Sequence, residues 1–217
     1  MKEIKYIMML GRPGCGKSYL YKNVISTALH QKGVKHIEKI DDFPILEELL
    51  GKDREFKKHV REDGGFRVTD WSIIDDVLKE IDDRLINKSS EGCVFLVEFA
   101  RSDYRKAIRN FSEEVREKSL LLYIWAPYDV CAADNLNRYE KSTHDSEKSV
   151  DDHIVPIELM ETYYKNDDLE EIYIQDMDAP PKGFYGWDIR FFNNTDRKVE
   201  NVIKEEKFLS LIKEFVI

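Results

Sequence analysis

The sequence predicts an α/β protein of three layers, in which a parallel sheet of five strands is covered by helices on both faces. Short apolar runs alternate along the chain with longer segments of helical periodicity, which is the pattern of a parallel sheet with crossover helices. The apolar runs are also nearly continuous, and continuous runs are typical of strands that are buried on both faces.

Each predicted element follows from its local pattern. The predicted strands are residues 5–10, 34–40, 93–99, 120–125 and 189–192. The predicted helices are residues 16–31, 71–87, 104–118, 129–140 and 197–215. In the second helix Ile74, Leu78, Ile81 and Leu85 recur at helical spacing, as a core-facing stripe should. No linker-like stretch interrupts this alternation, so we expect a single domain over residues 1–217.

Two stretches are longer than a simple crossover needs, at about 41–70 and about 135–188. Each follows a predicted strand at its C-terminal end, which is the edge where α/β sheets bind their ligands. Long connections at that edge are commonly binding loops or lids. We therefore expect the first stretch to lie on the substrate side and the second to act as a lid.

Composition and charge argue against a nucleic-acid-binding, disulfide-rich or membrane-spanning protein. The 217 residues are 42% hydrophobic, and 34 basic side chains against 43 acidic ones give a formal charge of -9. Such a charge disfavours long duplex nucleic acid as a partner. The three cysteines show no C-x-x-C spacing, which fits a reducing compartment better than a disulfide framework. No run approaches a membrane span or a signal peptide, so we expect a cytoplasmic protein.

The clearest motif is Gly-Arg-Pro-Gly-Cys-Gly-Lys-Ser at residues 11–18, which matches G-x-x-x-x-G-K-[ST] between a predicted strand and a predicted helix. In this motif backbone amides cradle phosphates, Lys17 reaches the β- and γ-phosphates, and the Ser18 hydroxyl binds Mg²⁺. We therefore expect ATP and Mg²⁺ as cofactors. The predicted nucleotide-binding residues here are Gly11, Gly14, Cys15, Gly16, Lys17, Ser18 and Tyr19.

Charged side chains follow other predicted strands. Glu98 ends the third strand, where a carboxylate could hold Mg²⁺ or accept the proton of an attacking hydroxyl, and Arg101 could balance phosphoryl charge. Asp41 and Asp42 follow the second strand, and the sequence leaves open which of them acts in chemistry and which caps a helix near residue 44. Arg138, in the lid-like stretch, could neutralise phosphate charge when a lid closes.

These residues together resemble the nucleoside- and nucleotide-kinase-like group of P-loop kinases, which includes adenylate, gluconate, adenylylsulfate and deoxynucleoside kinases. The likeness spans most of the chain, and only the phosphate-binding loop is a specific motif. The segment 98–101 is similar to the Glu-then-Arg element of deoxynucleoside kinases, with a longer spacing here. Residues 126–131 resemble the turn into the lid helix of adenylylsulfate-type kinases, although the arginine is delayed to Arg138. Residues 191–196 resemble the Asn-rich turn near the adenine, which implies a role for Asn194 in nucleotide binding.

By the same resemblance the expected strand order is 2-3-1-4-5. The first hypothesis for function is an ATP- and Mg²⁺-dependent kinase that acts on a small hydroxylated or phosphorylated metabolite, with nucleosides and nucleotides among the candidates. The alternatives are an ATP-binding switch or adaptor without a small-molecule acceptor, and a polynucleotide 5′-hydroxyl kinase. The sequence names neither the acceptor nor the oligomeric state, and it does not decide between ATP and GTP.

Overall fold

A computed structural model describes residues 2–62, 65–88, 92–144 and 155–217. Its strands are β1 (Lys2–Glu3), β2 (Tyr6–Leu10), β3 (His36–Asp41), β4 (His59–Glu62), β5 (Gly65–Val68), β6 (Cys93–Glu98), β7 (Ser119–Trp125), β8 (Gly183–Phe184), β9 (Trp187–Asn193) and β10 (Phe215–Val216). Its α-helices are α1 (Lys17–Leu20), α2 (Ser26–Gln31), α3 (Asp42–Lys52), α4 (Ser72–Lys88), α5 (Tyr104–Ala107), α6 (Glu113–Glu117), α7 (Tyr128–His144), α8 (Ile157–Thr162), α9 (Asp168–Gln175) and α10 (Asn201–Leu211).

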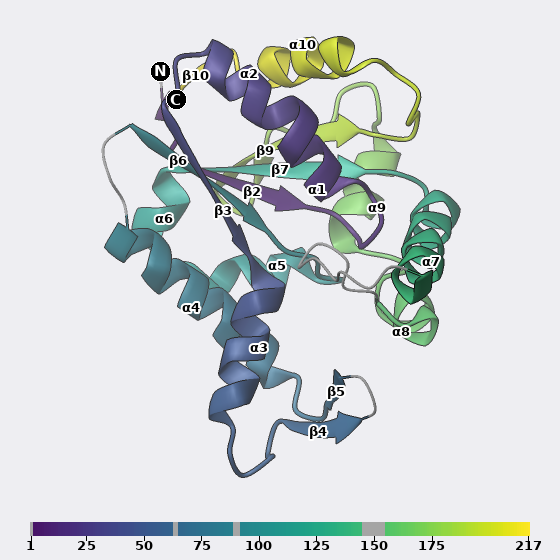
Figure 1. Ribbon diagram of the computed structural model, residues 1–217. Coiled ribbons are helices and arrows are strands. Elements are labelled where there is room, and N and C mark those ends of the chain that lie inside the picture. Colours follow the sequence, from purple (N-terminus) through teal and green to yellow (C-terminus); the bar gives the residue numbers. More distant parts are fainter. Residues whose placement is uncertain (1, 63–64, 89–91, 145–154) are drawn as a thin grey trace.

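The central sheet has six strands in the order β3-β6-β2-β7-β9-β8, and it is mixed (Figure 1). Five neighbouring strands run parallel, and β8 joins the edge antiparallel to β9. The prediction of a five-stranded, wholly parallel sheet is therefore wrong at this edge. The reason is local, because β8 is two residues long and forms a hairpin with β9 through a turn at Tyr185 and Gly186. A strand of that length has no hydrophobic pattern to detect.

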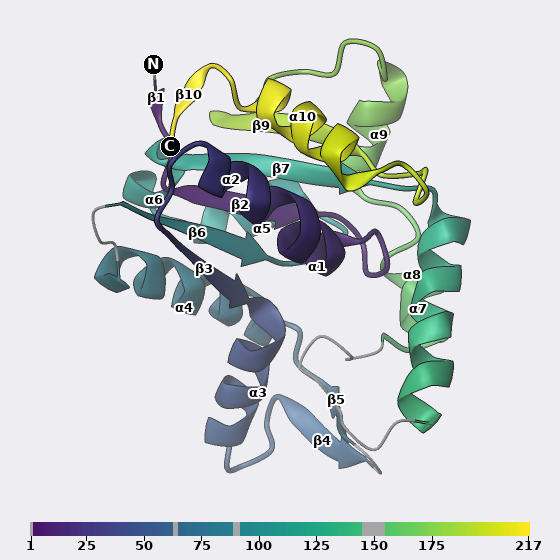
Figure 2. The same cartoon turned by 45° about the horizontal axis from the view of Figure 1, so that its top comes forward.

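Helices cover both faces of the sheet, as Figure 2 shows. Along β2 the side chains alternate, so that Tyr6 and Met8 pack on one face and Ile7 and Met9 on the other. The first face is covered by residues of α3, α4, α5, α6 and α9, and the second by residues of α1, α2 and α10. All five residues of β2 are buried, as expected of a strand between two helical layers.

Two predicted helices are divided. The helix expected at 16–31 consists of α1, a π-helical turn at Tyr21–Ile25, and α2. The helix expected at 104–118 is broken into α5, a 3₁₀ turn at Ile108–Asn110, and α6. The second break has a clear cause, because Ser112 caps α6 at the Val115 amide and also gives its own N–H and hydroxyl to buried Asp82 at 2.9 and 3.0 Å.

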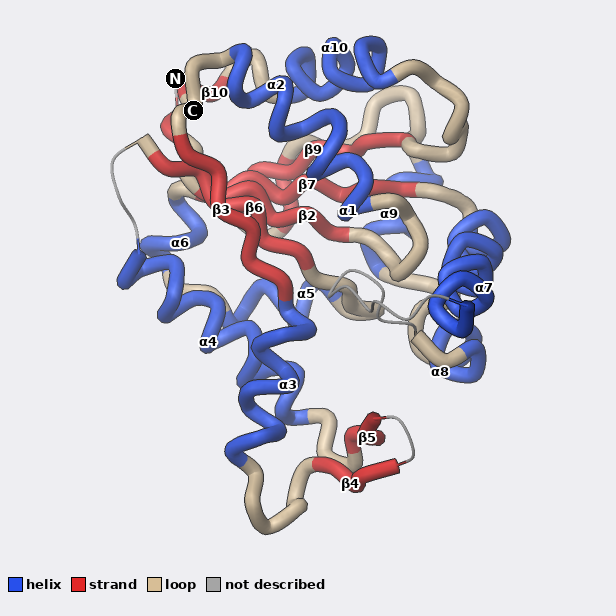
Figure 3. The backbone as a smooth tube through the Cα atoms, viewed as in Figure 1, coloured by secondary structure: helices blue, strands red, loops and turns tan. Residues whose placement is uncertain are grey.

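The two long excursions lie beyond the strand ends, where Figure 3 shows α3 and the β4–β5 hairpin on one side and α7 with α8 on the other. The first contains α3 and the antiparallel pair β4–β5. The second contains α7, α8 and α9, and its residues 145–154 lie outside the described part of the chain. None of the described helices combines the length and the apolar character that a membrane crossing requires.

Candidate active site

The phosphate-binding loop runs from the end of β2 into α1, and its glycines are required by both geometry and space. Gly14 and Gly16 have φ of 82° and 94°, a region that residues with a side chain rarely adopt. A Cβ on Gly14 would collide with the carbonyl oxygen of Cys131, and one on Gly16 would collide with the side-chain amide of Asn194. The loop is thus packed against α7 and against the residues that follow β9.

Side chains from distant parts of the chain form hydrogen bonds with the backbone of this loop. The Gly11 amide donates to the hydroxyl of buried Tyr104 at 2.8 Å. The carbonyl oxygen of Cys15 accepts from Asn194 Nδ2 at 2.9 Å and from Arg197 Nη1 at 2.8 Å. Asn194, predicted to take part in nucleotide binding, is buried and supports the loop backbone. Arg197 also binds the Gly14 carbonyl at 2.9 Å and was not predicted from the sequence.

Lys17, Ser18 and Glu98 meet at the C-terminal edge of the sheet. Lys17 Nζ donates to the carbonyl oxygens of Gly11 and Arg12 at 2.7 and 3.1 Å, and it lies 4.0 Å from Glu98 Oε1. The Ser18 hydroxyl lies 3.3 and 3.2 Å from the two carboxylate oxygens of Glu98. This arises because β6 lies beside β2, which places the last residue of β6 beside the first turn of α1.

A fourth side chain, the charged Lys39 of β3, completes this group. Its Nζ lies 2.9 Å from Glu98 Oε2 and 2.9 Å from Asp41 Oδ2. Burial alone would lower the pKa of Lys39, but the carboxylates of Glu98 and Asp41 outweigh it and raise the pKa above its usual value. Lys39 therefore remains charged and ties two carboxylates together. Sequence reasoning did not single out Lys39, because a lysine within a strand is ordinarily a surface residue.

Asp41 and Asp42 have different partners. Asp41 is the N-cap of α3 and accepts from the Phe43 amide at 3.1 Å, so the helix begins at Asp42 rather than near residue 44. Asp42 binds Arg101 Nη1 at 2.6 Å. Arg101 is buried, and it also donates to the carbonyl of Ala100 at 2.6 Å. This pair joins α3 to the end of β6, beside the Glu98 group.

Arg12 belongs to a second buried cluster behind the loop. Its side chain is 3% exposed, and its guanidinium forms an ion pair with Glu170 and lies 3.8 Å from Asp167. Asp167 caps α9 and accepts from the Tyr123 hydroxyl at 2.8 Å. Burial raises the pKa of Asp167 to about 6, in spite of the hydrogen bonds and the nearby guanidinium that oppose this. Sequence reasoning missed this cluster, since its members are spread over about 160 positions of the chain.

The remaining predicted residues lie around the loop. Cys15 is fully buried, and burial raises the pKa of its thiol, which fits a small packed residue. Tyr19 is 51% exposed and donates to Asn201 Oδ1 at 3.0 Å, on the outer side of α1. Arg138 is half-buried in α7, and among the described residues no contact joins it to Lys17 or Glu98. The structure thus brings Lys17, Ser18, Glu98 and Asp41 together and leaves Arg138 apart.

The donor groups present fit ATP and Mg²⁺. Gly11, Gly14 and Gly16 all have positive φ, the backbone conformation that lets successive N–H groups turn toward one bound phosphate. The Ser18 hydroxyl and the Glu98 carboxylate supply oxygen atoms, which are the ligands that Mg²⁺ prefers. Lys17 would pair with phosphate oxygens once it leaves the loop carbonyls that it now binds.

Comparison with known proteins identifies a fold. No family model matches the chain, and no curated protein matches it. Solved structures do match. APE1195 is 16% identical, with 99% of this chain and 97% of that chain covered and a TM-score of 0.53. A gluconokinase from Sinorhizobium meliloti 1021 is 14% identical, with 99% and 94% covered and a TM-score of 0.50.

A third similar structure is Kti12 of Chaetomium thermophilum in complex with ADP-AlF3. It is 13% identical, with 95% of this chain and 98% of that chain covered and a TM-score of 0.50. At such identities the likeness concerns the fold and not the substrate. The chain has a P-loop kinase-like fold, and no single structural relative is close to it.

Proposed function

We propose that this protein is an ATP- and Mg²⁺-dependent phosphotransferase that acts on a small hydroxylated or phosphorylated metabolite. The observation that carries this proposal is that Lys17, Ser18 and Glu98 lie together beside the glycine-rich loop, with Ser18 Oγ 3.2 Å from Glu98 Oε2. A carboxylate at that position serves either as a base for an acceptor hydroxyl or as support for the metal. Nucleosides and nucleotides are candidates among the acceptors.

Each residue has a distinct task in this proposal. Lys17 and the loop amides hold the β- and γ-phosphates, and Ser18 provides a metal ligand. Bound Mg²⁺ would supply charge neutralisation at the phosphates. Glu98 receives the proton of the acceptor, or positions the metal through water, and Lys39 fixes the orientation of its carboxylate. Asp42 and Arg101 lie on the α3 side of Glu98, where an acceptor would enter, and Asp41 stands next to them.

Nucleotide binding is the first test. We expect ATP with Mg²⁺ to bind the unmutated protein in calorimetry and to bind Lys17→Ala at least 10-fold more weakly, because a charge-assisted contact with the phosphates is lost. Lys32→Ala is the matched control, since Lys32 is exposed at the end of α2 and its removal changes the net charge equally. Equal affinity in Lys17→Ala and Lys32→Ala would contradict the proposed site. Competition between ATP and GTP sets the nucleotide preference.

Transfer is the second test. The protein is incubated with Mg·ATP and a pool of metabolites, nucleosides, nucleotides and 5′-hydroxyl oligonucleotides, and phosphorylated products are found by mass spectrometry. We expect one product class that is lost in Lys17→Ala and reduced 10²-fold or more in Glu98→Gln, with ATP binding retained by the latter. Tight ATP binding without any labelled acceptor would favour a switch or adaptor. Labelling of the oligonucleotides alone would favour a polynucleotide kinase.

A further inference from the structure

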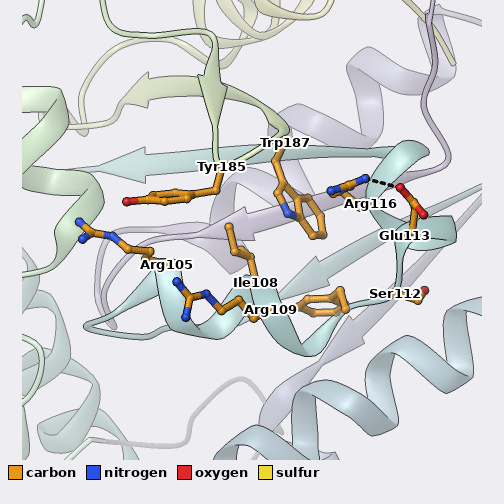
Figure 4. Close-up of a pocket in the computed structure, with 9 residues that line it drawn as sticks. Arg105, Ile108, Arg109, Ser112, Glu113, Arg116, Tyr185 and Trp187 are labelled. Atoms are coloured by element: carbon orange, nitrogen blue, oxygen red, sulfur yellow. Dashed lines mark hydrogen bonds and ion pairs between the residues drawn. The ribbon is translucent and has the colours of Figure 1, made fainter.

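A hollow of about 410 Å³ lies away from the phosphate-binding loop, between the α5–α6 segment and the β8–β9 hairpin (Figure 4). Its volume falls in the range of small-molecule pockets. It opens on the face of the sheet that carries α4, α5 and α6, whereas α1 packs on the opposite face. Tyr104 separates the two sites, since its hydroxyl accepts from Gly11 while its neighbour Arg105 lines the hollow.

The charge of this hollow is opposite to that of the chain. Arg105, Arg109 and Arg116 line it together with a single acidic residue, Glu113, in a protein of net charge -9. Glu113 is bound to Arg116 at 2.6 Å. Arg109 is exposed, and within the described ranges no carboxylate pairs with it. At least one full positive charge is therefore left for an anion.

The floor and one wall are aromatic and apolar. Trp187 and Phe111 are buried beneath the opening, with their ring centroids 5.9 Å apart, and Ile108 lies beside them. Tyr185 stands at the rim and is 57% exposed. The apolar surface of its ring is therefore left in water, where a bound molecule would cover it favourably. Arg105 lies 5.3 Å from the centre of the Tyr185 ring, so a guanidinium and an aromatic face stand side by side.

The hairpin turn fixes this arrangement. Tyr185 has φ of 48° and Gly186 has φ of 84°, a pair of left-handed residues that is typical of a tight two-residue hairpin turn. An aromatic residue rarely adopts that conformation, so the turn holds an unfavoured residue at the rim. Arg116 Nη1 would stand 3.6 Å from a Cβ on Gly186, an ordinary van der Waals distance, so the glycine is required here by its φ and not by space. Figure 4 shows Tyr185, Trp187 and the arginines around one space.

We propose that this pocket binds a small organic anion that combines a planar ring with a phosphate or carboxylate group. The arginines take the anionic group, with Arg109 as the main contact, and the ring packs between Tyr185 and the apolar floor. The site is independent of the phosphate-binding loop, because the two share no residue.

Fluorine NMR of protein labelled with 5-fluorotryptophan tests this proposal. The chain has three tryptophans, at 71, 125 and 187, and the fluorine signal that is missing from the spectrum of Trp187→Phe is that of Trp187. All titrations are made on the Lys17→Ala variant, in which phosphate binding at the loop is removed. Phenyl phosphate, benzoate and AMP are titrated, with inorganic phosphate and phenol as partial probes. We expect saturable shifts of the Trp187 signal with at least one ring-bearing anion, at 10-fold or more higher affinity than with phosphate or phenol.

Variants locate the site. Arg109→Ala is expected to weaken that binding 10-fold or more, whereas Arg54→Ala, an exposed arginine of the α3–β4 connection, removes the same charge and leaves the affinity unchanged. Circular dichroism checks that both variants fold. The proposal is overturned if the Trp187 signal does not move with any ring-bearing anion, if phosphate binds as tightly as phenyl phosphate, or if both variants bind alike. Each of these results leaves the function proposed for the loop untouched.

Discussion

At the scale of single residues, Lys39 holds two carboxylates of the site in place, with its Nζ 2.9 Å from both Glu98 Oε2 and Asp41 Oδ2. Lys17 and Ser18 follow from a motif, and Glu98 follows from the unusual presence of an acid at the end of an apolar strand. Lys39 has neither signal, because its role arises when β3 pairs with β6 and places Asp41 opposite Glu98. The sequence thus predicts the acids of the group but not the cation that holds them together.

Removing Lys39 should destabilise the fold. Lys39→Gln leaves the carboxylates of Asp41 and Glu98 without their common partner, and we expect the free energy of unfolding in urea to fall by about 1–3 kcal/mol. Lys52→Gln is the control, since Lys52 forms a solvent-exposed pair with Glu48, and such pairs contribute little to stability. Adding Asp41→Asn to Lys39→Gln should restore part of the loss. Equal losses in both single variants would contradict this account.

Asp167 should make stability depend on pH. Its pKa is about 6 in the folded protein against 3.8 in the free side chain. The folded protein thus binds the proton more tightly, so this group contributes fully below about pH 4, and the contribution is lost as pH rises through 6. The pKa difference corresponds to about 3 kcal/mol. Because Asn resembles the protonated acid, the stability of the unmutated protein relative to Asp167→Asn should decrease by up to that amount between pH 4 and pH 7.

Urea unfolding of both proteins across this pH range is the measurement. The comparison isolates Asp167, because the other carboxylates titrate alike in the two proteins. The groups that face Asp167 are Arg12, Glu170 and the Tyr123 hydroxyl. A difference that is constant with pH, or that grows in favour of the unmutated protein as pH rises, would show that the guanidinium of Arg12 outweighs burial.

At the scale of elements, the phosphate-binding loop is held by α7 as well as by its own motif. Gly14→Ala places a methyl group against the Cys131 carbonyl of α7, whereas Gly33→Ala meets nothing within 4 Å. Both residues have a similar φ, 82° and 92°, so both substitutions carry the same backbone cost of about 1 kcal/mol. We expect Gly14→Ala to lose several-fold more ATP affinity than Gly33→Ala, as measured by calorimetry. We also expect a larger decrease in the free energy of unfolding in urea.

The elements also show where sequence reasoning succeeds and fails. The strands of the sheet core were located from continuous apolar runs, and α4 from its helical stripe. The β4–β5 hairpin and β8 were missed, because two to four residues are too few to display a period. The break between α5 and α6 depends on Asp82, which is 30 positions from Ser112 in the chain. Such breaks are tertiary in origin, and no local pattern contains them.

At the scale of the whole molecule, the ends of the chain contribute to one of the two cores. Phe215 of β10 is buried beside Ile4 and Phe208, and the Arg190 guanidinium stands 4.9 Å from the centre of its ring. Phe215→Ala should lower the free energy of unfolding by about 3–4 kcal/mol. Its neighbour Val216 is 44% exposed, so Val216→Ala should change stability by about 0.5 kcal/mol or less. Similar effects of the two substitutions would contradict this packing.

The pairing of β1 with β10 has a mechanical consequence. The two strands run parallel, with Lys2 opposite Phe215 and Glu3 opposite Val216, and the Ile4 amide donates to the Val216 carbonyl at 2.8 Å. In Figures 1 and 2 the N- and C-termini stand next to each other. A tension applied between residues 2 and 217 pulls parallel neighbours in opposite directions, so it loads their hydrogen bonds in shear rather than opening them one at a time. In an optical trap this short clamp would have to rupture before force could reach the sheet behind it.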